Sequence, residues 1–110
     1  MQTSTSVIEL SREELMQQCY ELGYEYEQKV SVCSQCTLAA LEHAFHVKND
    51  ALFQASFALA GGGGETGKGY CGALAGGILF LSLFFGRRRT EFDLGIDNYR
   101  AFPLAEKLVH

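Results

Sequence analysis

The chain has 110 residues, of which 47% are hydrophobic and 20% charged, with a single Pro. This length and composition predict one folded domain, residues 1–110, with a modest core, and they argue against disorder. The formal net charge of −4 argues against nucleic acid as a partner, because surfaces that bind nucleic acid are basic. The run Arg87–Arg89 is a basic cluster of the kind typical of a solvated helix end.

The first residues, MQTSTSVIELSREE, lack a basic segment followed by an apolar one, so we expect no secretory signal. The expected location is therefore the cytoplasm, where thiols stay reduced. Four cysteines in such a chain indicate thiol chemistry, metal binding or core packing rather than a disulfide framework.

Helical patterns with no competing strand pattern predict an all-α fold, a small up-and-down bundle of four to five helices. Residues 1–10 are expected to be irregular, and a capping box of Ser11 and Glu14 opens the first helix. The second helix is expected to be largely buried. We expect helices at about residues 11–29, 31–47, 51–60, 70–86 and 99–109, a glycine-rich loop at 61–69 and a connection at 90–98.

The stretch from Tyr70 to Gly86, YCGALAGGILFLSLFFG, contains no charged residue. Its length is at the lower limit for a membrane span, and Gly72 and Gly76 have the spacing of small residues at helix contacts. Its glycines and the preceding loop favour instead a buried central helix of a bundle. Close packing at Gly72 and Gly76 also suggests a homodimer.

Residues 62–69, GGGETGKG, match a phosphate-binding loop except at the last position. Gly69 stands there in place of the Ser or Thr whose hydroxyl holds magnesium. The preceding residues are predicted to be helical, whereas a phosphate-binding loop follows a strand. We therefore interpret this segment as an interhelical turn and assign no cofactor-binding residue to it.

Cys33 and Cys36 form a C-x-x-C at the first turn of the second helix, and Cys71 lies at the first turn of the fourth. A thiol at a helix N-terminus faces the positive end of the dipole, which favours the reactive thiolate. Alternate helices of an up-and-down bundle run in the same direction, so the three cysteines should meet at one end. They are the candidate catalytic residues of a redox site or, alternatively, ligands of a metal ion.

Three further side chains are expected to stay outside this site. Cys19 lies on the apolar stripe of the first helix and is expected to be a core thiol. His43 and His46 have a spacing that could hold a metal, but they lie roughly 10–20 Å along the helix from the C-x-x-C. They are expected on the polar face or at the helix end.

This order of features resembles the C-GCAxxG-C-C family, a group of proteins named for redox activity. The early cysteine is Cys33, and the motif Cys-Gly-Ala-x-x-Gly stands at residues 71–76, after a glycine-rich loop. The resemblance covers about residues 31–109. It implies a small helical domain active through its cysteines, and it leaves an iron–sulfur cluster or another metal open as the cofactor.

The chain departs from the family pattern in its cysteines. Family members carry two further cysteines near a longer C-terminus, whereas none follows Cys71 here. A completed fifth helix would return to the end that holds Cys33 and Cys71, and Cys36 could replace one of the missing thiols. We therefore expect a dithiol pair, or a site shared across a dimer, rather than four thiolates in one chain.

Three functions stay open at this point. In the leading one, Cys71 acts with Cys33 or Cys36 in thiol/disulfide or electron-transfer chemistry on a redox partner protein or a small thiol, as in a thiol-dependent oxidoreductase. The second is a metal or iron–sulfur binding module. The third is a helical interaction or membrane-associated protein whose cysteines only pack.

Overall fold

The computed structural model describes residues 10–109, so the irregular segment predicted at the N-terminus falls almost wholly outside the described residues. Within residues 10–109 the chain forms six α-helices and one short 3₁₀ helix, with no strand, which confirms the all-α prediction and is consistent with a small helical bundle. The elements are α2 (Arg12–Lys29), α3 (Cys33–Phe45), α4 (Asp50–Ala55), η1 (Phe57–Leu59), α5 (Gly72–Phe85), α6 (Arg89–Asp93) and α7 (Ala101–Val109).

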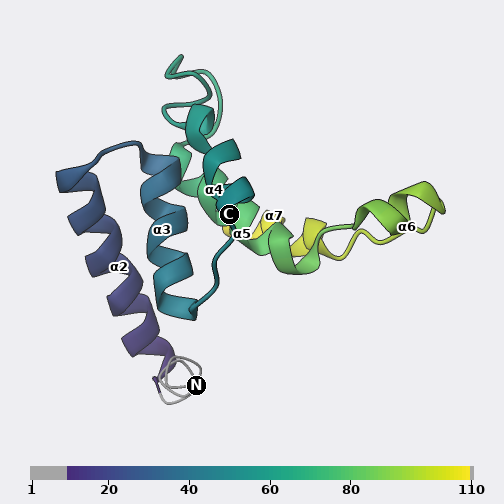
Figure 1. Cartoon of the computed structure of the whole chain (residues 1–110), viewed down its shortest axis with the longest axis horizontal. Coiled ribbons are helices and arrows are strands. Elements are labelled where there is room, and N and C mark those ends of the chain that lie inside the picture. Colours follow the sequence, from purple (N-terminus) through teal and green to yellow (C-terminus); the bar gives the residue numbers. More distant parts are fainter. Residues whose placement is uncertain (1–9, 110) are drawn as a thin grey trace.

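Helix α2 begins at the predicted capping box. The backbone N–H of Glu14 donates to Ser11 Oγ at 3.1 Å, and the backbone N–H of Ser11 donates to Glu14 Oε1 at 2.8 Å. The helix then runs antiparallel to α3, so that Gly23 faces the side chain of Ala40. None of its residues is buried, and α2 forms an outer layer over one side of α3 (Figure 1).

Helix α3 is the centre of the fold, with α2 on one side and α5 on the other (Figure 1). Its most buried side chain is Leu38, which has no exposed surface. The expectation of a largely buried second helix is confirmed, because α3 supplies most of the small core. Its buried residues are Ser34, Cys36, Leu38, Ala40 and Ala44.

Helices α3 and α5 begin at the same end and run in the same direction. A Cβ added at Gly76 would lie 2.8 Å from the backbone oxygen of Ser34 and 3.2 Å from Thr37 Cβ, and farther along the two helices the rings of Phe45 and Phe80 are 5.7 Å apart. The missing side chains of Gly72 and Gly76 therefore allow α5 to approach α3 of the same chain. These glycines serve packing within the chain, not the dimer contact that their spacing suggests.

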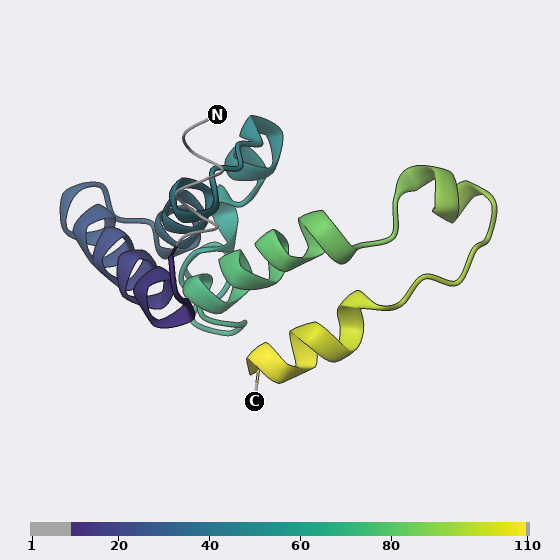
Figure 2. The same ribbon diagram turned by 90° about the horizontal axis from the view of Figure 1, so that it is seen from below.

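The prediction that the fourth helix is buried at the centre of the bundle is wrong for the second half of α5, which is not buried. Only Gly72 and Gly76 are buried in α5, and Leu83, Phe84 and Phe85 are exposed. Helix α7 packs antiparallel along α5, and both extend away from α2 and α3 with α6 at the far end (Figure 2). We call residues 83–102 the arm. In the described range, no helix combines the length and apolarity needed to span a bilayer.

Two further predictions need correction. The third helix is broken at Ser56, whose hydroxyl donates to the backbone oxygen of Phe53 at 2.7 Å, and the chain continues as η1. The predicted connection at 90–98 contains α6, because the Glu91 carboxylate accepts the backbone N–H of Arg88 at 2.9 Å and starts a helical turn.

Candidate functional site

Cys33 and Cys71 lie at two adjacent helix N-termini. Cys33 is the first residue of α3, and Cys71 is the N-cap of α5. A Cβ added at Gly72 would overlap the Cys33 sulfur and would lie 3.0 Å from the backbone nitrogen of Ser34. The thiol of Cys33 therefore occupies the space beside the residue that follows Cys71, as the shared direction of the two helices predicts.

Both helices begin without a side-chain cap. No side-chain hydrogen bond caps α3 at Val32 or α5 at Cys71. The first N–H groups of a helix have no partner within the helix, and together with the dipole they favour negative charge. Cys71 is exposed and Cys33 is half-buried, so a reagent or partner meets Cys71 first.

Cys36 has a different environment from the other two candidates. It is buried, with 5% of its surface exposed, and its thiol donates to the backbone oxygen of Ser31 at 2.9 Å. The pKa of Cys36 is raised to about 11, mainly by burial and also by the neighbouring Glu27 and Cys33. Cys36 is therefore a protonated thiol at neutral pH, and it lacks the thiolate that nucleophilic attack needs.

The turn before α3 is strained. Ser31 and Val32 have positive φ values of 65° and 67°, a region that non-glycine residues rarely adopt and that is least favourable for a β-branched side chain. This conformation sets Cys33 at the start of α3 and points the Ser31 carbonyl at the Cys36 thiol. Sequence reasoning missed it, because Ser and Val carry no local signal for a left-handed turn.

Two buried serines, Ser34 and Ser56, connect the start of α3 to the end of α4. Sequence reasoning did not single them out. Ser34 is fully buried and its hydroxyl donates to the backbone oxygen of Ser56 at 2.8 Å. Gln35 Nε2 donates to the backbone oxygen of Phe53 at 3.2 Å. The sequence did contain one signal for these contacts, because two polar residues, Ser34 and Gln35, stand inside the C-x-x-C of a helix that is expected to be buried.

The glycine-rich loop closes on itself before it reaches Cys71. The backbone N–H of Gly67 donates to the Gly61 oxygen at 2.8 Å, and that of Gly69 donates to the Gly62 oxygen at 3.0 Å. A Cβ at Gly69 would lie 2.6 Å from the Gly62 oxygen, so the position of the missing Ser or Thr has no room for a side chain. The loop follows a 3₁₀ helix, and the interpretation as an interhelical turn is confirmed.

A pocket of about 380 Å³ lies beside Cys36, between α2, α3 and the α4–η1 segment. Mostly apolar side chains line it, which accounts for the cost of ionising a thiol there. The pocket residues are Tyr26, Val30, Ser31, Val32, Gln35, Cys36, Ala39, Phe53 and Phe57.

The remaining sulfur and imidazole groups lie elsewhere. Cys19 is half-buried between α2 and α3, and burial raises the pKa of its thiol, which agrees with a packing role. His43 and His46 are exposed near the C-terminal end of α3, as expected.

The described residues bring together no set of metal ligands. In residues 10–109, no group of three or more His, Cys, Asp or Glu side chains is placed to hold a metal ion. The thiol of Cys36 instead donates a hydrogen bond to the Ser31 carbonyl. Cys33 and Cys71 are left as an adjacent pair rather than as part of a ligand set.

These observations define a small helical domain with two neighbouring cysteines at the N-termini of parallel helices. The chain belongs to the family described as "Putative redox-active protein (C_GCAxxG_C_C)", whose family model matches residues 31–110. The matched range begins in the strained turn before Cys33 and leaves out α2. Searches of curated proteins and of solved structures give no match.

Proposed function

We propose that the protein is a thiol–disulfide redox protein whose redox pair is Cys71 and Cys33. The observation that carries the proposal is the position of the Cys33 sulfur against Gly72, the residue next to Cys71. Membership of a family named for redox activity supports it. The exposure of Cys71 supports it as well, because a partner can reach this thiol.

The exposure of the two thiols assigns their roles. The exposed Cys71 thiolate attacks one sulfur of a disulfide in a partner protein or a small molecule, and the other partner sulfur leaves as a thiolate. The half-buried Cys33 then attacks the Cys71 sulfur of the mixed disulfide, forms a Cys33–Cys71 bond and releases the second partner sulfur. Two electrons pass to the partner, and the two protons lost by the cysteines go to the two released thiolates.

Cys36 does not take part in this exchange at neutral pH. Its pKa of about 11 keeps it protonated, and it forms a hydrogen bond to the Ser31 carbonyl beside the pocket between α2, α3 and the α4–η1 segment. The C-x-x-C of α3 is thus not the redox dithiol. The proposed pair joins α3 to α5 instead.

Partial oxidation followed by peptide mapping tests the pair. The reduced protein is equilibrated with a glutathione redox buffer, its free thiols are alkylated at low pH, and its disulfides are mapped by mass spectrometry. We expect one internal disulfide, Cys33–Cys71. In Cys33→Ser we expect a mixed glutathione disulfide to accumulate on Cys71, because the resolving thiol is gone.

Cys19→Ser and Cys36→Ser are the matched controls, and both should keep the Cys33–Cys71 disulfide. A disulfide between Cys33 and Cys36, or unreactive Cys33 and Cys71 in the folded protein, would overturn the proposal. Metal analysis and an absorption spectrum after anaerobic purification complete the test. A bound metal lost in Cys33→Ser and Cys71→Ser would replace the redox pair with a metal site.

A further inference from the structure

The arm exposes a large apolar surface. Its large apolar side chains are each exposed by more than a third, from 36% for Leu83 to 76% for Leu94. With about 180 Å² for one such side chain when fully exposed, they present on the order of 700 Å². A stable interface covers about 800 Å² per partner. The residues are Leu83, Phe84, Phe85, Phe92, Leu94, Ile96, Tyr99 and Phe102.

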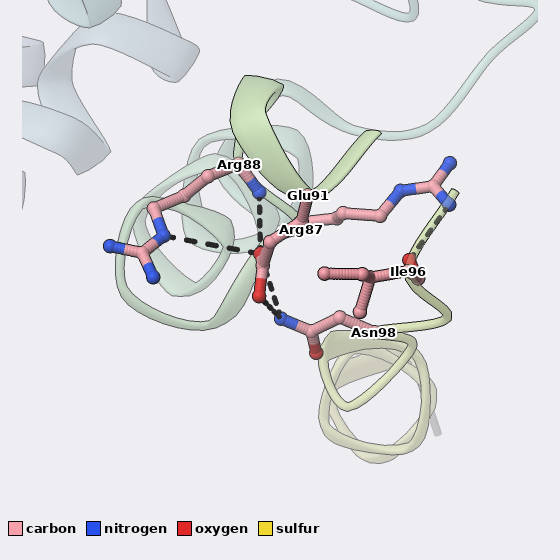
Figure 3. Close-up of polar contacts among 5 residues, drawn as sticks. All are labelled: Arg87, Arg88, Glu91, Ile96 and Asn98. Carbon is pink, nitrogen blue, oxygen red and sulfur yellow. Dashed lines mark hydrogen bonds and ion pairs between the residues drawn. The ribbon is translucent and has the colours of Figure 1, made fainter. Parts of the chain in front are cut away.

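The arm holds these side chains in a fixed arrangement. Asn98 Nδ2 donates to both carboxylate oxygens of Glu91, at 3.1 and 3.2 Å, and Arg87 Nη1 donates to the backbone oxygen of Ile96 at 3.3 Å (Figure 3). The rings of Tyr99 and Phe102 are stacked with their centroids 5.6 Å apart. A surface that is ordered before it binds loses less entropy on binding.

The same chain carries a second surface that complements the arm. An open groove of about 640 Å³ lies between α2 and α3, and its walls are mostly apolar. Met16, on this groove, is 63% exposed. The lining residues are Arg12, Leu15, Met16, Cys19, Leu41 and Phe45.

The charges around the two surfaces are also complementary. The arm carries the run Arg87–Arg89 at its base and Arg100 beyond, against three carboxylates in the same segment. Helix α2, which forms one wall of the groove, carries five glutamates along its length against Lys29 and Arg12, of which Arg12 itself lines the groove. Opposite charges at the rim of an interface set the orientation of the partners and increase the rate of association.

A single chain cannot bring the two surfaces together. Helix α2 lies on one side of α3, and the arm extends from α5 on the other side, away from α2 (Figure 1). We infer that the arm of each chain docks in the α2–α3 groove of a second copy. In a dimer with a twofold axis, each arm would dock in the groove of the other chain. Both arms and both grooves would then be occupied, so no further chain could add.

The oligomeric state of the full chain tests this inference. Sedimentation velocity over a range of concentrations should show a dimer that dissociates more readily at high salt, because screening weakens the charge contacts. Phe92→Asp should weaken dimerisation at least tenfold. Phe57→Asp is the matched control, since Phe57 and Phe92 are both 57% exposed but Phe57 lies on η1, and it should leave the dimer intact.

A cross-link identifies the surfaces. Cys19 lines the groove, so in a C33S/C36S/C71S background the variant F92C should form a bismaleimide cross-link between two chains through Cys19. The same background without F92C should not form that Cys19–92 link. Circular dichroism shows whether each variant keeps its helix content.

Three results would overturn the inference. One is a monomer at every concentration, and another is a dimer unaffected by Phe92→Asp and without the cross-link. The third is a monomer that co-sediments with vesicles containing anionic phospholipid and loses that binding in Phe92→Asp. The arm would then contact a membrane surface instead of a second copy.

Discussion

The sulfur of Cys33 lies against Gly72, the residue that follows the exposed Cys71. This relationship joins the N-termini of α3 and α5 and requires that position 72 have no side chain. Gly76, one turn further along α5, keeps the same close approach against Ser34 and Thr37. The glycines of the Cys-Gly-Ala-x-x-Gly motif therefore position the cysteine pair. The following predictions test this arrangement and its surroundings.

Gly76→Ala should destabilise the protein although alanine is the better helix former. The added Cβ would lie 2.8 Å from the Ser34 backbone oxygen, which cannot move without displacing α3. We expect a loss of about 1–3 kcal/mol in urea denaturation, against a helix-propensity gain of about 1 kcal/mol. Gly77→Ala is the control, because its nearest neighbour is the flexible end of Leu108 at 3.1 Å, and it should be neutral or stabilising. Equal effects of the two variants would refute this account of the helix contact.

Gly72→Ala should separate the redox pair. Its new methyl group would occupy the position of the Cys33 sulfur, so that side chain must move. We expect the yield of the Cys33–Cys71 disulfide in a glutathione buffer to fall at least tenfold, while alkylation of the exposed Cys71 stays within about twofold of wild type. Unchanged disulfide formation would show that the close contact at Gly72 is not needed for pairing.

Ser34→Ala should cost stability through the loss of a buried hydrogen bond, although the Ser56 oxygen still accepts the backbone N–H of Leu59 at 3.1 Å. The Ser34 hydroxyl donates to the Ser56 oxygen in a fully buried position, and its loss leaves that oxygen without this bond. We expect a loss of about 0.5–1.5 kcal/mol in thermal or chemical unfolding. Thr66→Ala removes a hydroxyl that bonds Gly62 and Gly63 on the exposed loop and should cost clearly less. A smaller effect at Ser34 than at Thr66 would contradict the prediction.

Ser31→Gly should stabilise the protein, because glycine adopts a φ of 65° without strain. The Ser31 side chain is exposed, and its backbone oxygen remains available to Cys36. We expect a gain of up to about 1 kcal/mol by differential scanning calorimetry. Gln28→Gly, at an exposed position inside α2, should lose about 1 kcal/mol. Loss of stability in both variants would mean that the turn is not strained.

Stability should fall between about pH 9 and pH 11 because of Cys36. Its pKa is raised from 9.0 to about 11, so above pH 9 the unfolded chain releases this proton while the folded chain retains it. The associated stability is fully present below pH 9 and is lost as the pH rises through 11, by an amount on the order of 3 kcal/mol. Urea titrations at several pH values measure it. Cys36→Ala should show a shallower dependence, and an equal slope in both proteins would assign the effect to other groups.

Local sequence signals predicted several elements well. Ser11 and Glu14 form their capping box because its two hydrogen bonds join residues only three apart. The run Gly61–Gly64 forms a loop in which all four glycines have positive φ. The neighbouring positions of Cys33 and Cys71 followed from the directions of alternate helices in a bundle. In each case the information lies within a few residues or in the order of the elements.

Contacts between distant segments decided what the sequence did not reveal. Cys33 and Cys36 look equivalent in C-x-x-C, but Cys36 is buried against the Ser31 carbonyl and Cys33 lies beside Gly72. Apolar residues in α5 predicted burial, yet Leu83, Phe84 and Phe85 remain 36–48% exposed among the described residues.

The sequence by itself therefore determined an all-helical domain of this family, with cysteines at two helix N-termini, because helical periodicity, capping and chain direction are local properties. Only the tertiary structure decided which thiol stays protonated, which glycines are needed for packing, and which apolar surface remains open to a partner. Those properties depend on desolvation, on hydrogen-bond partners and on room for a side chain. Each is set by segments far apart in the chain.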